Sequence, residues 1–301
     1  MSQSVSPVSR ARVYLRLGRI SNLPTVWTNV LAGVALAPPR VPGAPMRPAS
    51  VALLALAMSL FYVGGMFLND AFDRKIDARE RPERPIPAGH VTAGEVFAAG
   101  YAFLAAGLAL VALHTRLYGG GEAPVVSAAL LGGAILLYDA WHKRNPVSPL
   151  LMALCRVLVY VTAAIATSGR LGLPVLGGAL SLLFYLVGLT AIAKQENLRS
   201  ARSLAALGFM AVPLIYTAGA AVTGVAGLAA YAALVACVAY AVRILRGDSK
   251  DRIPRAVVTL IAGISLLDAA LLAGRGAPVA AALAMLAFPL TLGLQRYVRG
   301  T

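Results

Sequence analysis

Long apolar stretches, separated by short polar and charged segments, run along the whole chain. A helix needs roughly 20 mostly apolar residues to cross a bilayer, and continuous apolar runs of that length favour helices over strands. Such windows fall at about 21–38, 49–69, 92–113, 124–141, 150–168, 172–193, 204–221, 226–246, 256–273 and 277–295. They predict an all-α fold, a polytopic membrane helical bundle of nine or ten transmembrane helices. The count is nine if one of the last pair, separated only by Gly274-Arg275-Gly276, is a kinked or half-buried segment.

The composition supports a membrane protein and excludes an ordinary soluble domain. Of the 301 residues, 59% are hydrophobic and 13% are charged, and the mean hydropathy is +0.76. Soluble domains average about 25% charged residues. Because no soluble domain or low-complexity linker interrupts the pattern, residues 1–301 are predicted to form a single transmembrane domain. Paired glycines inside the spans, Gly64-Gly65, Gly132-Gly133 and Gly177-Gly178, are interpreted as helix-packing positions.

The formal net charge of +15 would suggest a nucleic-acid ligand in a soluble protein. Here the charges lie in short loops, so they indicate topology, and no nucleic-acid partner is expected. Apart from Arg156, within a span, all basic residues lie on the N-terminal side of the spans except Arg40, Arg47, Arg116, Arg170 and Arg275. The positive-inside rule therefore predicts cytoplasmic charged loops and a basic cytoplasmic tail at 1–20. The multi-pass protein is expected in the cell (plasma) membrane.

A cluster of carboxylates follows the second apolar window. Acids are scarce, twelve in all, yet Asp70, Asp73 and Asp77 come at i, i+3 and i+7 directly after this window. On a helix these offsets share one face, and carboxylates at the mouth of a membrane helix suit a hard divalent cation such as Mg²⁺. A solvated loop is the alternative interpretation, but ionisable residues this close to membrane depth are costly and usually functional.

Basic residues adjoin these acids and recur at other span ends on the same side. Groups for a metal and groups for an anion together suggest a metal-bridged phosphate or diphosphate. At the later span ends, an ordinary membrane interface is the alternative interpretation. The candidates are Arg74 and Arg84 after the second window, Tyr138, Lys143 and Arg144 at the fourth, and Lys194 and Glu196 at the sixth.

Two ionisable residues lie inside spans. Arg156 is about two turns into the fifth window, where a lone arginine is expected to face the bundle interior. It either pairs with an acid such as Asp139 or binds an anionic group. Asp268, in the middle of the ninth window, is interpreted as a hydrogen-bonded or protonated structural residue.

These residues resemble the UbiA superfamily of intramembrane prenyltransferases. The motif N-D-x-x-D-x-x-x-D of that family is complete, its R-P-I/L-P segment is similar to residues 84–87, and its Tyr-x₄-Lys-Arg element is present after the fourth span. The residues concerned are Asn69, Asp70, Asp73 and Asp77, then Arg84, and then Tyr138, Lys143 and Arg144. The second Asp-rich motif of the family is not matched, because Glu196 is the only acid at 190–197. This departure is similar to the EboC-like bacterial branch, and it leaves a second Mg²⁺ site open. One hypothesis is that Lys194 replaces that metal.

The resemblance implies Mg²⁺-dependent transfer of a prenyl group from an allylic prenyl diphosphate to a small, aromatic or cyclic acceptor, with release of diphosphate. Asp70, Asp73 and Asp77 would hold Mg²⁺ against the donor, whose tail would reach membrane lipids. The implied catalytic residues are these three acids and Lys143. The implied substrate-binding residues are Asn69, Arg74, Arg84, Tyr138, Arg144, Arg156, Lys194 and Glu196. Two other classes stay open: a membrane transporter or lipid carrier, and a catalytically impaired relative that binds isoprenoid phosphates.

Overall fold

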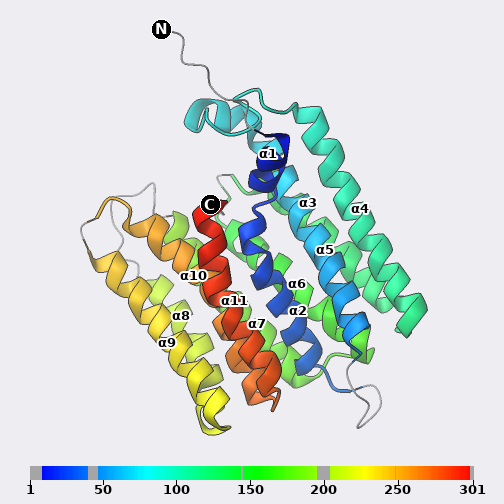
Figure 1. Cartoon of the computed structure of the whole chain (residues 1–301), viewed down its shortest axis with the longest axis vertical. Helices are drawn as coiled ribbons and strands as arrows, with labels where there is room; N and C mark the ends of the chain where they lie inside the picture. Colours follow the sequence, from blue (N-terminus) through cyan, green and yellow to red (C-terminus); the bar gives the residue numbers. More distant parts are fainter. Residues whose placement is uncertain (1–8, 40–46, 144, 195–203, 248, 299–301) are drawn as a thin grey trace.

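The computed structural model describes residues 9–39, 47–143, 145–194, 204–247 and 249–298, and within these it is a bundle of helices without strands (Figure 1). The described elements, in chain order, are α1 (Arg10–Leu17), η1 (Ile20–Asn22), α2 (Leu23–Leu36), α3 (Pro48–Glu80), α4 (Ala93–Tyr118), α5 (Ala123–Trp141), α6 (Ser148–Ser168), α7 (Leu173–Lys194), α8 (Leu204–Thr217), η3 (Ala218–Val222), α9 (Val225–Arg246), α10 (Arg252–Gly274) and α11 (Pro278–Tyr297). The predicted all-α fold class is confirmed.

Eight helices in the described residues are long and apolar enough to cross a membrane, namely α3 to α7 and α9 to α11. The two remaining predicted windows, 21–38 and 204–221, coincide with shorter helices. The first holds the 14 residues of α2, and the second holds α8 with the 3-10 helix η3. The exact number of spans, nine or ten, stays a prediction.

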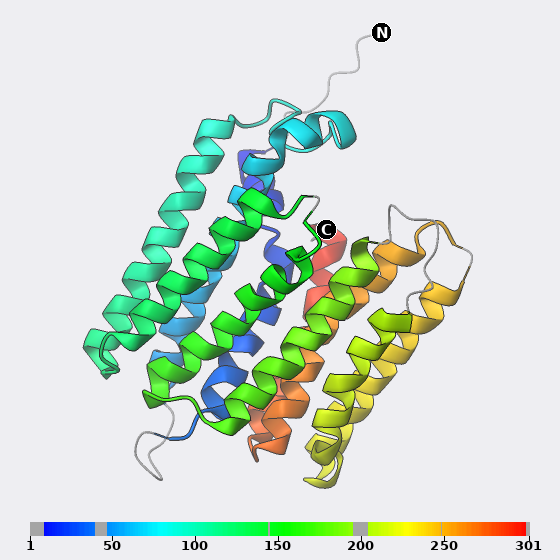
Figure 2. The ribbon, with the colours of Figure 1, turned by 180° about the vertical axis from the view of Figure 1, so that it is seen from behind.

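Two helices, α2 and α10, hold the bundle together. α2 packs against α3, α6, α10 and α11, and α10 packs also against α7 and α9. Figures 1 and 2 show α3, α4 and α5 on one side of these helices and α8 and α9 on the other. The site described below lies on the α3 side.

Glycine lets α3 and α4 approach closely at Gly64, one of the glycines interpreted from the sequence as helix-packing positions. A Cβ atom on Gly64 would lie 2.9 Å from the backbone oxygen of Gly100 on α4. The same interpretation is wrong for Gly133, because a Cβ there would meet nothing within 4 Å in the described structure.

The C-terminal ends of α3 and α5 lie at the same end of the bundle as α1, the upper end in Figure 1. α3 has 33 residues and is therefore about 50 Å long, whereas the hydrocarbon core of a bilayer is about 30 Å thick. Its last turns, which carry the predicted acidic motif, therefore extend beyond the hydrocarbon.

Part of the segment predicted as a basic tail, 1–20, is folded. Residues 10–17 form α1, and its buried side chains Val13 and Leu17 join Phe67 of α3 in a small apolar cluster. The i, i+4 spacing of Val13 and Leu17 places them on one face of α1, which docks this helix beside the site.

Candidate active site

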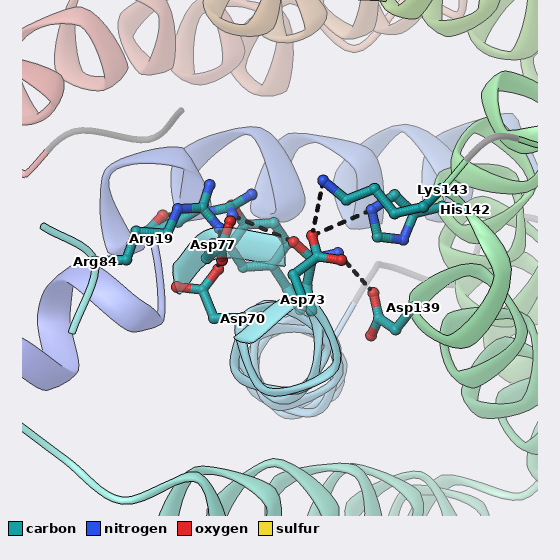
Figure 3. A network of polar contacts seen from close by, with 10 residues as sticks. Arg19, Asp70, Asp73, Asp77, Arg84, Asp139, His142 and Lys143 are labelled. Atoms are coloured by element: carbon teal, nitrogen blue, oxygen red, sulfur yellow. Dashed lines mark hydrogen bonds and ion pairs between the residues drawn. The ribbon is translucent and has the colours of Figure 1, made fainter. Parts of the chain in front are cut away.

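Asp70, Asp73 and Asp77 lie on one face of α3, as their spacing predicts, and all three are at most 7% exposed. Burying carboxylates is costly unless partners compensate their charge. Figure 3 shows that the partners come from segments far apart in the sequence. The predicted cluster is therefore the centre of a larger network of ion pairs.

Arg84 joins two of the carboxylates. Its Nη1 atom lies 3.1 Å from Oδ1 of Asp70 and 2.8 Å from Oδ2 of Asp77. The chain leaves α3 after Glu80 and folds back through turns, in which the amide of Ala88 donates to the backbone oxygen of Arg84. This turn returns the arginine to the face of the helix that precedes it.

Asp73 faces the end of α5. Its Oδ2 atom lies 3.3 Å from Nε2 of His142 and 3.4 Å from Nζ of Lys143. The His142 ring stacks on Tyr138, with ring centroids 4.9 Å apart. The predicted residues Tyr138 and Lys143 are thus brought to the acidic motif, together with a histidine that sequence reasoning gave no role.

Arg19 is the second residue that sequence reasoning missed. Its Nη2 atom donates to Oδ1 of Asn69 at 3.3 Å and to Oδ1 of Asp70 at 3.1 Å. Burial by itself lowers the pKa of Arg19, but the Asp70 carboxylate together with Tyr62 and Tyr138 outweighs it, and the net shift of this pKa is upward. The guanidinium therefore remains charged at the mouth of the bundle.

The backbone of Arg19 also has an unusual conformation, with φ 43° in the left-handed region. Non-glycine residues rarely adopt this conformation, and such strain collects at functional sites. In sequence Arg19 is one of several arginines before the first span, and only its place next to the apolar window sets it apart.

Asn69 links Arg19 to a fourth carboxylate. Its Nδ2 atom donates to Oδ1 of Asp139 at 3.2 Å, while its Oδ1 atom accepts from Arg19. Both hydrogen-bonding groups of the Asn69 amide are used, which fixes its orientation between α3, α5 and the N-terminal segment.

A cavity of about 190 Å³ begins at this network and continues between the helices. Its walls are mostly apolar and come from the two main apolar clusters of the bundle. Polar groups line it at a few positions only. These are Arg19, Asn22, Tyr62, Tyr138, Asp139, Cys155 and Arg156.

Arg156 points into the bundle interior as predicted, but no ion pair with Asp139 is recorded in the described structure. It donates to Oδ1 of Asn29 at 2.9 Å and to Oγ1 of Thr25 at 3.1 Å. Its guanidinium carbon lies 5.3 Å from the centroid of the Tyr62 ring. The buried carboxylate of Asp268 acts on this guanidinium through its charge, and the binding of an anionic group by Arg156 stays a prediction.

Asp268 is a hydrogen-bonded structural residue, as interpreted from the sequence. It is fully buried and accepts hydrogen bonds from Thr28, Asn29 and Tyr160. These bonds tie α10 to α2 and α6 beneath Arg156.

Some predicted site residues are not brought to the network. Arg74 turns away from it, since its Nη1 atom donates to the backbone oxygen of Ala71 and its guanidinium lies over Phe97. Arg144 and Glu196 lie outside the described residues. Lys194 ends α7, but its side chain is likewise outside the description.

The carboxylates suit Mg²⁺ by their chemistry. Asp70 and Asp77 both approach one cationic nitrogen, that of Arg84, so two hard oxygen donors already flank a single cationic position. No group of three His, Cys, Asp or Glu side chains in the described part of the chain forms a ready metal cage. Mg²⁺ usually binds through one or two carboxylates together with substrate phosphates and waters, and an open set of acids fits that mode.

Comparison with known proteins shows the family to which this chain is similar. The UbiA prenyltransferase family model matches residues 26–262. A digeranylgeranylglyceryl phosphate synthase of Ignicoccus hospitalis is 36% identical over 129 residues, 43% of this chain but only 38% of that relative.

Two solved structures share the fold. One, described as giving insight into digeranylgeranylglyceryl phosphate synthase in membranes, has a TM-score of 0.60 at 18% identity and covers 90% of this chain and 99% of its own. The other, a UbiA homologue from Archaeoglobus fulgidus bound to DMAPP and Mg²⁺, has a TM-score of 0.51 at 16% identity over 88% and 98% of the two chains. Because the family match spans most of its length, this chain belongs to the UbiA prenyltransferase family.

Proposed function

We propose that the protein transfers a prenyl group from an allylic prenyl diphosphate to a small aromatic or cyclic acceptor and releases diphosphate. The observation that carries this proposal is the junction between the ion-pair network and the largely apolar cavity of about 190 Å³. A prenyl diphosphate has the same division into a highly charged head and an apolar tail. Its head matches the network and its tail the cavity.

The residues of the network have distinct roles in this proposal. Asp70, Asp73 and Asp77 would hold Mg²⁺, which when bound neutralises the charge of the diphosphate leaving group. Arg19, Arg84 and Lys143 pair with these carboxylates in the structure, and they donate to diphosphate oxygens once the donor is present. Arg144 and Lys194 stay predicted members of this group.

The apolar walls of the cavity protect the reaction from water. An allylic cation formed when the C–O bond breaks is captured by water wherever water has access. The cavity walls include Phe61 and Leu131, both at most 2% exposed. Because these walls exclude water, the acceptor is the nucleophile that can reach the allylic cation.

Arg156 is proposed to bind an anionic group of the acceptor. It lines the cavity, and its hydrogen bonds to Asn29 and Thr25 hold the guanidinium. The charge of the buried Asp268 acts on it, but no carboxylate of the described residues forms an ion pair with it. A carboxylate or phosphate suits this planar donor group. The phosphate in the name of the Ignicoccus relative is in keeping with such an acceptor.

Family membership favours an enzyme over a transporter or lipid carrier. The site is proposed to face the cytoplasm from the cell membrane, because basic residues gather at its end of the bundle. Soluble cytoplasmic acceptors would then reach it directly.

The test measures diphosphate release by the purified protein with geranyl, farnesyl and geranylgeranyl diphosphates, with and without Mg²⁺. A pooled lipid-free cell extract supplies acceptors, and mass spectrometry of the lipid fraction detects the prenylated product. We expect release and product to require Mg²⁺ and to fall at least about 100-fold in Asp70→Ala and Asp73→Ala, the equivalent of about 3 kcal/mol.

The matched control is Glu122→Ala, which removes an exposed acid at the opposite end of α5 and is expected to leave both readouts unchanged. Folded wild-type protein that releases no diphosphate with any donor would contradict the proposal. It would favour a catalytically impaired relative that only binds isoprenoid phosphates.

A further inference from the structure

Asp139 is a buried carboxylate with one unused oxygen. Its side chain is 4% exposed. Its Oδ1 atom accepts from Asn69 at 3.2 Å, whereas no group in the described residues donates to its buried Oδ2 atom. A buried polar atom without a partner costs about 1–3 kcal/mol, and such an atom in a folded protein calls for an explanation.

The other acids of the site differ from Asp139 in their ion-pair partners. Asp70, Asp73 and Asp77 each pair with at least one cationic side chain, which places them with the donor head group. Asp139 lines the cavity itself and forms no ion pair among the described residues, although the charge of Arg19 acts on it from a greater distance. Its position is therefore at the boundary between the head-group network and the space for the reacting carbon chain.

The surroundings of Asp139 hold its carboxylate in place. The Asn69 amide that binds Oδ1 is itself oriented by Arg19. The other ionisable groups that act on Asp139 are Tyr138 next to it, Cys155 of α6, and Asp70 and Asp73 of α3. With Oδ1 engaged, the lone pairs of Oδ2 are the part of this carboxylate that remains for a ligand in the cavity.

We propose that Asp139 is the proton acceptor of the transfer reaction, an inference that rests on the proposed function. The bond between the prenyl C1 atom and the bridging oxygen breaks, and its electron pair leaves with the diphosphate. The acceptor atom, a hydroxyl oxygen or an aromatic carbon, forms the new bond to C1. The proton that this atom carries passes to Oδ2 of Asp139 and then to water when the product leaves. The acceptor is thus a nucleophile that loses a proton as it is alkylated.

Two steps of the reaction depend on different residues. Ionisation of the donor needs the head-group network, whereas completion of the transfer needs Asp139. Asp139→Asn keeps an oxygen that accepts from Asn69 but cannot accept a proton. Asp139→Glu keeps a carboxylate at a shifted position.

The experiment uses geranylgeranyl diphosphate labelled with ¹⁸O at the bridging position. Scrambling of the label into non-bridging positions reports ionisation and return, and prenylated lipid formed with the pooled extract reports complete transfer. In Asp139→Asn we expect product formation to fall about 10²–10⁴-fold, the range for loss of a general base. Label scrambling per enzyme should change less than about threefold, and Asp139→Glu should recover part of the transfer.

Glu122→Gln, at the far end of the same helix, is the matched control, and the thermal unfolding midpoint of each variant shows that it is folded. Asp139→Asn that transfers as well as the wild type, or that loses scrambling as much as transfer, overturns the role of Asp139. A wild-type protein that neither scrambles the label nor forms product overturns the proposed function instead, and this inference with it.

Discussion

Arg19 shows how a single side chain joins two distant parts of the site. It lies between α1 and α2, yet its guanidinium reaches Asn69 and Asp70 on α3. Its left-handed backbone conformation costs on the order of 1–3 kcal/mol, which persists only where the surroundings fix it. The docked helix α1 and the two oxygen acceptors provide that constraint.

Replacing Arg19 by alanine is expected to weaken donor use specifically. The substitution removes a partly buried, charge-paired donor, and loss of one partner of a fully buried charge pair typically costs about 2–5 kcal/mol. We expect kcat/KM for the prenyl diphosphate to fall by about 100-fold or more, measured as diphosphate release. Arg19→Lys keeps the charge but not the planar fork, and should restore only part of the activity.

Arg16→Ala is the matched control for Arg19, because Arg16 is an exposed arginine of the same segment. Its kcat/KM should remain within about twofold of the wild-type value, since exposed charges contribute little. Equal activity of the two alanine variants would show that Arg19 is only a structural partner of Asp70.

Spacing explains which site residues could be predicted. The acids of α3 were recognisable because i, i+3 and i+7 positions on one helix are local information. Arg19 and Asn69, or Asn69 and Asp139, are separated by 50 and 70 residues, and no local pattern records such pairs. Arg74 was placed wrongly for a related reason. Its neighbours in sequence suggested the site, but its turn of α3 faces Phe97 on α4.

At the scale of elements, hydropathy predicts where helices lie but not how each one is used. The apolar windows coincide with all eight helices of spanning length in the described residues, because a membrane requires an internally hydrogen-bonded backbone. The eight residues of α1 escaped the prediction, because only Val13 and Leu17 are buried there and no window of spanning length forms. Its function in the fold depends on tertiary packing against Phe67.

The close contact between α3 and α4 can be tested with a pair of glycines. In Gly64→Ala the new Cβ meets a backbone oxygen at 2.9 Å, and overpacking of this kind costs about 1–3 kcal/mol. Alanine gains up to about 1 kcal/mol of helix propensity over glycine, so the net change should be destabilising. We expect a lower thermal unfolding midpoint in detergent.

Gly133→Ala is the matched control for this contact. Gly133 lies in α5, where a Cβ meets nothing within 4 Å in the described structure. Only the gain in helix propensity remains, so its unfolding midpoint should equal or exceed that of the wild type. Equal midpoints for the two variants would mean that α3 and α4 separate without cost.

At the scale of the whole molecule, charge and chemistry lie at the same end. The described basic residues at the end with the site greatly outnumber those at the other end, as the sequence predicted. Those at the far end are Arg47, Arg116, Arg170 and Arg275. An excess of basic residues favours the cytoplasmic side of a membrane, and it also attracts the highly charged donor. In the proposed orientation, one asymmetry would both orient the protein and place the site where soluble substrates are available.

The orientation can be tested with single cysteines at the two ends of the bundle. Glu80→Cys lies at the exposed end of α3 beside the site, and Glu122→Cys lies at the exposed start of α5 at the far end. We expect a membrane-impermeant maleimide to label the Glu122→Cys protein in intact cells, but the Glu80→Cys protein only after permeabilisation. The parent protein, whose Cys155 and Cys237 are at least partly buried, gives the background. Labelling of Glu80→Cys in intact cells would place the site outside the cytoplasm and contradict an orientation set by the basic residues.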